Sequence, residues 1–216
     1  MATLDDSASR TTSSPIGARA RAELEIMGLS QNMKILDAGC GTGAATRKIA
    51  QLVSPGEVVG IDIDAPFLET GKMLAEGEGI KNIRFELGNI DDISYEAGFF
   101  DKVYCRLVLM HVNNPVKTVR ELARVTKKGG LVAVSDNDDG VIISYPHAPK
   151  FQALWSKFGQ RAREKGENRY IGRELFSIFS QAGLSSIQVY PFPMYATQEN
   201  PVMLKSLVSV PMRART

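Results

Sequence analysis

The stretch ILDAGCGTG, residues 35–43, decides the fold. Ile35 and Leu36 belong to a short apolar strand, and glycines follow at the alternate positions 39, 41 and 43. A glycine loop directly after a buried strand lets the backbone turn sharply and lets a ligand approach it closely. The helix expected next offers free backbone N–H groups in its first turn. The stretch therefore predicts a strand–loop–helix unit that binds a ligand.

Strand-like and helix-like segments alternate from Met33 to Asp136. Strands are expected at 33–38, 57–62, 82–87, 99–110 and 129–136, and helices at 45–53, after Asp64 and from Asn114 to Arg124. This order is typical of right-handed βαβ units in a parallel sheet. The carboxyl ends of the strands then share one edge, where open sheets of this kind bind their ligands.

The alternation stops after Asp136. Residues 137–170 hold two prolines and an amphipathic stretch, and we expect them to form a lid or an insertion on the substrate side. A helix is predicted at 171–183, ended by Gly183, and a strand at 185–196 that two prolines interrupt. The periodicity of 202–210 fits a last strand or a helix, and we leave both open.

Composition excludes several classes of protein. The 216 residues suit one domain, placed at 15–216, after a leader at 1–14 that we expect to be disordered. The net charge of +2 argues against a nucleic-acid partner, and no apolar run reaches the roughly 20 residues of a stable membrane insertion. The two cysteines form no disulfide framework, so a reduced, cytoplasmic location is expected.

Two aspartates indicate the kind of ligand. Asp37 lies two residues before the first glycine, where a pyrophosphate would gain nothing from a carboxylate but an amino group would. Asp62 ends the second strand, 19 residues after Gly43, and can accept hydrogen bonds from both hydroxyls of a ribose. Nicotinamide-binding folds use the same ribose position, so Asp62 by itself predicts an adenosine cofactor of either kind.

The motif DAGCGTG (37–43) resembles the first motif of class I S-adenosylmethionine (SAM)-dependent methyltransferases. The segment FFDKVYCRLVLMHVNNPVKTVRELARVTKKGG (99–130) resembles their ubiquinone/menaquinone-biosynthesis-type branch, which acts on small molecules. The resemblance implies a Rossmann-like, doubly wound α/β sheet of about seven strands in the order 3-2-1-4-5-7-6, with the last strand antiparallel and helices on both faces. It also implies SAM as cofactor and S-adenosylhomocysteine as product.

The same resemblance implies a cofactor site along the strand edge. The loop would cradle the amino-acid part of SAM, Asp62 the ribose and Ile63 a face of adenine, while Arg106 would meet the cofactor carboxylate or an acidic substrate. Asn89 replaces the usual acidic residue near adenine, and backbone groups around Ile90 could recognise the base alone. The cofactor-binding residues expected are Asp37, Ala38, Gly39, Cys40, Gly41, Gly43, Asp62, Ile63, Asn89, Ile90 and Arg106.

Catalysis and acceptor binding are less constrained by the sequence. His111 is the candidate general base, with a structural role as its alternative. The candidate substrate residues are Asp136 and Trp155. Asp136 begins an acidic cluster with Asp138 and Asp139, and the alternative for this cluster is a solvated turn. The alternative for Trp155 is core packing. No cysteine or histidine spacing suggests a metal site. Direct in-line displacement at the methyl carbon is expected, driven mainly by proximity, with an O, N or C acceptor atom.

Three other functions remain open at this point. A nicotinamide-dependent oxidoreductase would share the ribose carboxylate but would not need Asp37. A non-catalytic module that binds SAM or S-adenosylhomocysteine would share the whole cofactor site. A nucleic-acid methyltransferase would require a motif for a flipped base after the fourth strand, which CRLV (105–108) does not supply. A homodimer is compatible with the sequence.

Overall fold

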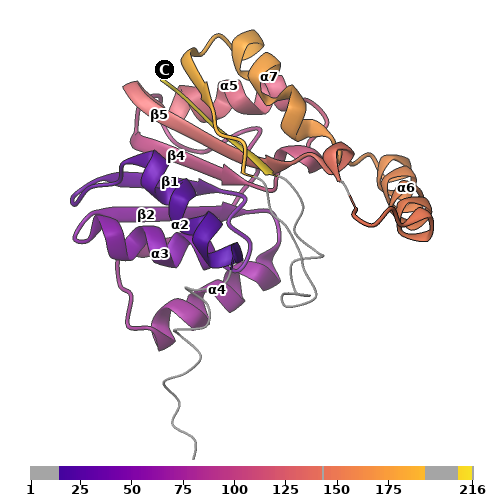
Figure 1. The fold of residues 1–216 in the computed structure, drawn as a ribbon. Coiled ribbons are helices and arrows are strands. Elements are labelled where there is room, and N and C mark those ends of the chain that lie inside the picture. Colours follow the sequence, from indigo (N-terminus) through magenta and orange to yellow (C-terminus); the bar gives the residue numbers. More distant parts are fainter. Residues whose placement is uncertain (1–14, 143, 193–208, 216) are drawn as a thin grey trace, which may run out of the picture.

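A single sheet with helices on both faces forms the body of the protein (Figure 1). The computed structural model describes residues 15–142, 144–192 and 209–215; the predicted leader 1–14 lies outside them. The strands are β1 (Lys34–Ala38), β2 (Glu57–Asp62), β3 (Ile83–Leu87), β4 (Phe100–Arg106), β5 (Thr126–Asn137), β6 (Ser185–Val189) and β7 (Ser209–Arg215). Their order is β3-β2-β1-β4-β5-β7-β6, as predicted.

Helices and short 3-10 turns connect these strands. The helices are α2 (Pro15–Met27), α3 (Ala44–Val53), α4 (Ala65–Gly77), α5 (Pro115–Val125), α6 (Pro149–Glu164) and α7 (Leu175–Ala182), and the 3-10 turns are η1 (Leu109–His111), η2 (Asp139–Val141) and η3 (Ile171–Glu174). Strands β1 to β5 pair in parallel, whereas β7 runs antiparallel to both of its neighbours, β5 and β6. The predicted antiparallel last strand is therefore confirmed.

Successive strand residues enter opposite cores, which is what a doubly wound sheet requires. Ile35 and Val58 pack with α2 and α3, whereas their neighbours Leu36 and Val59 face the larger core under α5 and α7. Both cores are built mainly from buried aliphatic side chains, with Phe100 and Phe179 in the larger one and Tyr104 in the smaller one. Because helices cover both faces of the sheet, side chains in the middle of a central strand are buried on either side. Only side chains near the end of such a strand can reach solvent.

Local signals begin and end the helices as the sequence predicts. Asp64 accepts a hydrogen bond from Phe67 N at 3.1 Å, and Asn114 accepts one from Lys117 N at 3.0 Å, so both act as N-caps before a proline. Gly183 has φ +90° and closes α7. The predicted helix 171–183 is divided, because η3 precedes α7.

Two strand boundaries differ from the prediction. The run expected as a strand over 99–110 ends at Arg106, because Leu107 takes φ +58° and the chain turns into η1. Strand β5 begins at Thr126 rather than at 129, and its register with β4 shifts between Phe100 and Lys102. Most of 202–210 lies outside the described residues, and the strand that is described covers 209–215.

Candidate functional site

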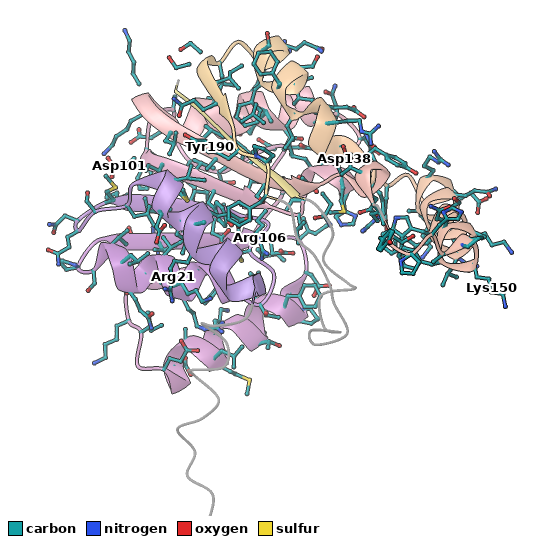
Figure 2. All side chains as sticks on the ribbon, in the orientation of Figure 1. Arg21, Asp101, Arg106, Asp138, Lys150 and Tyr190 are labelled. Carbon is teal, nitrogen blue, oxygen red and sulfur yellow. The ribbon has the colours of Figure 1, made fainter. Side chains whose placement is uncertain are left out.

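The carboxyl ends of β1, β2, β4 and β5 meet at one edge of the sheet, as Figure 2 shows for Arg106, opposite Asp101 at the other end of β4. The glycine loop leaves β1 at this edge. Gly39, Gly41 and Gly43 all have φ between +53° and +75°, a region that other residues rarely adopt. Gly39 and Cys40 donate their N–H groups to Ile61 O at 2.8 and 3.0 Å, so the loop is fastened to the end of β2.

The two outer glycines pack against the protein, whereas the middle one faces open space. A Cβ on Gly39 would lie 2.4 Å from Val108 Cγ2, and one on Gly43 would lie 2.5 Å from Phe85 Cζ. A Cβ on Gly41 would meet nothing within 4 Å. The loop therefore presents bare backbone to the solvent at Gly41 while both of its ends are held.

Asp37 braces this loop from below. Its carboxylate is 2% exposed and accepts a hydrogen bond from Thr46 Oγ1, in the first turn of α3, at 2.6 Å. Burial raises the pKa of Asp37 to about 6, although the hydrogen bond from Thr46 and the charge of Arg106 lower it. The side chain thus ties β1 to α3 across the glycine loop, with Ala38 buried next to it.

Asp62 joins the glycine loop to the end of β2. One carboxylate oxygen accepts the Gly41 N–H at 2.7 Å, and the other accepts the Asp64 N–H at 3.0 Å. The side chain is partly exposed, and a carboxylate has about four lone-pair sites. Asp62 can therefore hold the loop and still accept hydrogen bonds from a ligand.

An exposed apolar surface follows Asp62. Ile63 is 75% exposed and Leu87, at the end of the neighbouring strand, is 67% exposed. Asn89 is also exposed, but its Oδ1 accepts the Asp91 N–H at 2.9 Å. Ile90 packs its side chain into the core, so it could meet a ligand only through its backbone. These positions offer an apolar face with polar backbone groups beside it.

Arg106 pairs with a residue that the sequence analysis does not identify. Its Nε lies 3.2 Å from Oε2 of Glu23, a buried residue of α2. Glu23 also accepts hydrogen bonds from Tyr104 Oη at 2.6 Å and Ser135 Oγ at 2.7 Å. The Arg106 Nε is buried without a hydrogen bond in the described chain. Arg106 is therefore neither a free surface arginine nor fully satisfied.

Asp136 holds the turn after β4. It is fully buried, and its carboxylate accepts the N–H groups of Met110 at 3.3 Å and Asn137 at 3.0 Å. Burial raises the pKa of Asp136 to about 6, while hydrogen bonds from the backbone of residues 108–110 lower it. The expected substrate residue is thus engaged by the backbone of η1. His111, at the end of η1, is half exposed, and its Nδ1 lies 3.9 Å from Glu167 Oε1.

The acidic cluster after β5 is not a solvated turn. Asp138 accepts two hydrogen bonds from Arg173, at 2.8 and 2.7 Å, and Asp139 accepts one from Arg169 at 2.5 Å. Asp139 N also donates to Arg169 O at 2.9 Å. These contacts close the base of an excursion, residues 140–142 and 144–168, that we name the α6 arm and that projects from the body in Figure 1.

Trp155 lies on the α6 arm among other aromatic rings. Its indole packs against Phe151 and Phe158, with centroids 5.9 and 5.4 Å away, and its Nε1 donates to Asp139 O at 3.3 Å. Arg169 lies over the Phe158 ring at 5.0 Å. These aromatic side chains therefore anchor α6 to the base of its own arm rather than to the main core.

Three features besides the glycine loop are relevant to a functional site: metal-ligand side chains, the Cys40 thiol and a cavity at the other edge of the sheet. In the described ranges, no group of three or more His, Cys, Asp and Glu side chains could hold a metal ion. Cys40 is half buried in the loop, and burial raises the pKa of its thiol, which keeps it protonated. A cavity of about 710 Å³ lies at the opposite edge of the sheet, near Asp101, Lys102 and Lys127, away from the glycine loop.

The groups exposed at the loop are of the kinds that S-adenosylmethionine requires. The open backbone at Gly41, the partly exposed Asp62 carboxylate and the exposed Ile63 match an amino acid, a ribose and a flat base in turn. The fold and the glycine loop bring these groups to one edge. The Asp37 carboxylate lies beneath the loop, where it accepts from Thr46 Oγ1. The Asp136 carboxylate lies beneath the β4–η1 turn, where it accepts from Met110 N.

Comparisons with known proteins agree with this geometry. A family model described as "Methyltransferase domain" matches residues 29–174. A demethylmenaquinone methyltransferase of Bacillus cereus is 29% identical over 182 residues, which cover 78% of this chain and 77% of that protein. The "Probable methyltransferase ltbC" of Aspergillus luteorubrus is 35% identical over 142 residues, 62% of this chain; the match spans about half of that relative (49%).

A solved structure shows the same fold. The crystal structure of a SAM-dependent methyltransferase from Aquifex aeolicus superposes with a TM-score of 0.64 at 18% identity, and the match covers 98% of each chain. No helix in the described residues is both long and apolar enough to cross a membrane.

Proposed function

The chain belongs to the class I S-adenosylmethionine-dependent methyltransferases, and from that premise we propose that it methylates a small molecule bound beside the glycine loop. The observation that carries the proposal is the position of the Asp62 carboxylate. It accepts the Gly41 N–H at 2.7 Å and the Asp64 N–H at 3.0 Å, and it stays partly exposed at the edge of the sheet. The similarity to a demethylmenaquinone methyltransferase supports a small-molecule acceptor.

We assign the cofactor residues as follows. Gly39, Gly41 and Gly43 shape the loop, and Asp37 braces it from below. Asp62 accepts the ribose hydroxyls. Ile63 and the backbone around Asn89 and Ile90 hold the adenine, while Ala38 and Cys40 line the loop. Arg106, which pairs with Glu23, would meet the cofactor carboxylate or an acidic substrate.

The bound cofactor would supply a methyl group on a sulfonium sulfur, and that sulfur leaves readily as a neutral thioether. The protein therefore needs mainly to orient the acceptor toward the methyl group and to exclude water. The glycine loop fixes one partner by backbone contacts. The α6 arm, with Trp155 at its base, acts as the lid on the acceptor side. His111 is half exposed on the turn after β4, where it could accept a proton from an acceptor that must lose one.

A thermal-shift scan tests the proposal with SAM, S-adenosylhomocysteine, NAD and NADP in parallel. A ligand at 100 times its dissociation constant adds about 2.7 kcal/mol to the free energy of unfolding. We expect stabilisation by the first two alone. A shift with a nicotinamide cofactor would instead support an oxidoreductase, and SAM binding without turnover on an acceptor panel would support a binding module.

The variant Asp62→Ala sharpens the test. Loss of hydrogen bonds to a charged acceptor costs about 1.5–3 kcal/mol each, so SAM affinity should fall at least tenfold. Asp64→Asn is the matched control, because Asp64 caps α4 beside the site. Equal losses of affinity in both variants would refute the ribose role of Asp62.

A further inference from the structure

The outer face of α6 carries an exposed mixture of apolar and basic side chains. Lys150, Leu154, Lys157 and Arg161 follow one another at intervals of four, three and four residues and therefore share one side of the helix. Phe158, four residues after Leu154, lies at the border of the same side. Leu154 is 66% exposed, and the three basic residues are exposed as well. One part of the Phe158 ring contacts Trp155 and Arg169, and the side chain is still 46% exposed. We name these five residues the outer α6 face.

The opposite side of the helix is already used. Gly159 and Ala162 are buried, and Tyr170 lies against Gly159. Trp155 is bonded to the base of the arm. The outer α6 face therefore cannot turn inward without breaking these contacts. Figure 2 places Lys150 at the far end of α6, directed away from the sheet.

The charges of this face have no acidic counterpart. Within the described part of the chain, no ion pair joins Lys150, Lys157 or Arg161 to a carboxylate, and Glu164 is the only acidic residue of α6. By contrast, Arg169 and Arg173 at the base of the arm are paired with buried aspartates. The unpaired cations thus concentrate on the part of the arm that projects furthest.

We propose that the outer α6 face docks reversibly on an anionic lipid surface. An amphipathic helix with Leu and Phe between Lys and Arg is suited to lie in the interface of a bilayer, with its apolar side chains among the acyl chains and its cations at the headgroups. RNA would satisfy the cations but would leave Leu154 exposed. The apolar residues between the cations therefore favour lipid. The docking needs no membrane-spanning segment.

The first experiment is flotation of the full chain with vesicles, without SAM. We expect binding to phosphatidylcholine mixed with phosphatidylglycerol, much weaker binding to phosphatidylcholine alone, and loss of binding as salt screens the charges. Because no cofactor is present, failure here leaves the methyl-transfer proposal intact. Absence of binding to the anionic vesicles, or equal binding to both kinds, would overturn the docking proposal.

Variants identify the surface responsible. Each cation near an anionic surface contributes about a fivefold factor, so Lys157→Gln with Arg161→Gln should weaken vesicle binding about 30-fold. Leu154→Ser should weaken it about tenfold, because a leucine leaves the acyl region. Lys48→Gln with Lys81→Gln removes the same charge from exposed positions outside α6 and should leave binding unchanged.

A circular-dichroism melt of each variant checks that α6 and the body remain folded. If the control variant lost as much binding as the α6 charge variant, net charge rather than this face would be responsible, and the proposal would fail. If Leu154→Ser had no effect while the α6 charge variant also lost binding to single-stranded RNA, the surface would be a nucleic-acid site instead.

Discussion

Asp37→Asn should remove a specific dependence of stability on pH. Burial raises the pKa of Asp37 from 3.8 to about 6 in the folded protein. Between these values the folded state binds more protons than the unfolded state, so stability falls as pH rises through this window. Asn keeps the shape of the side chain and an oxygen that can accept from Thr46, but it does not titrate.

The magnitude follows from the same two pKa values. From about pH 8 to about pH 5, the wild type should gain about 1–2 kcal/mol of unfolding free energy relative to Asp37→Asn. Urea titrations of both proteins at the two pH values, followed by circular dichroism, measure this difference. A difference between the proteins that stayed constant with pH, or that changed in the opposite direction, would refute the idea that Asp37 is buried at a cost.

Three further substitutions test other contacts. Glu23→Gln should lower the free energy of unfolding by about 1–3 kcal/mol, because it weakens a buried charged acceptor, whereas Glu25→Gln, exposed on the same helix, should change it little. Gly39→Ala and Gly129→Ala both place alanine at φ +75°, which costs each variant about 1–2 kcal/mol of strain. Only Gly39→Ala also brings its Cβ to 2.4 Å from the Val108 side chain, so it should lose more unfolding free energy; equal losses in the two variants would contradict this packing. If His111 is the general base, His111→Ala should reduce turnover and leave SAM affinity intact, and unchanged turnover would exclude that role.

The glycine loop could be predicted because its signal is local, whereas the strand order was predicted from the resemblance to a known family. Strands β1 and β3 are short runs followed directly by a glycine, whereas β4 continues into further apolar residues without such a signal, and right-handed crossovers restrict the order of strands without fixing it. Asp62 could be identified in the same way, because its position at the end of the second strand follows from the chain alone.

Contacts between distant segments could not be predicted. Residues 15–27 hold several apolar residues, but these do not gather on one face of a helix and the first turn has no acidic residue, so no amphipathic pattern predicts α2. Glu23 is buried only because Tyr104 and Ser135 face it from two different strands. The end of β4 has a similar cause: Asp136, 26 residues after Met110 along the chain, accepts the backbone N–H groups that a longer strand would have used.

The ion pairs Arg169–Asp139 and Arg173–Asp138 close the α6 arm at its base, so the arm is a structural unit separate from the sheet. The chain leaves the body at Asn137 and returns at Gly172, where a Cβ would lie only 2.8 Å from Asn137 O. Because the exit and return points touch, the intervening segment can be lengthened, shortened or exchanged at little cost to the sheet. An exchange of the arm would therefore leave the sheet and the glycine loop in place.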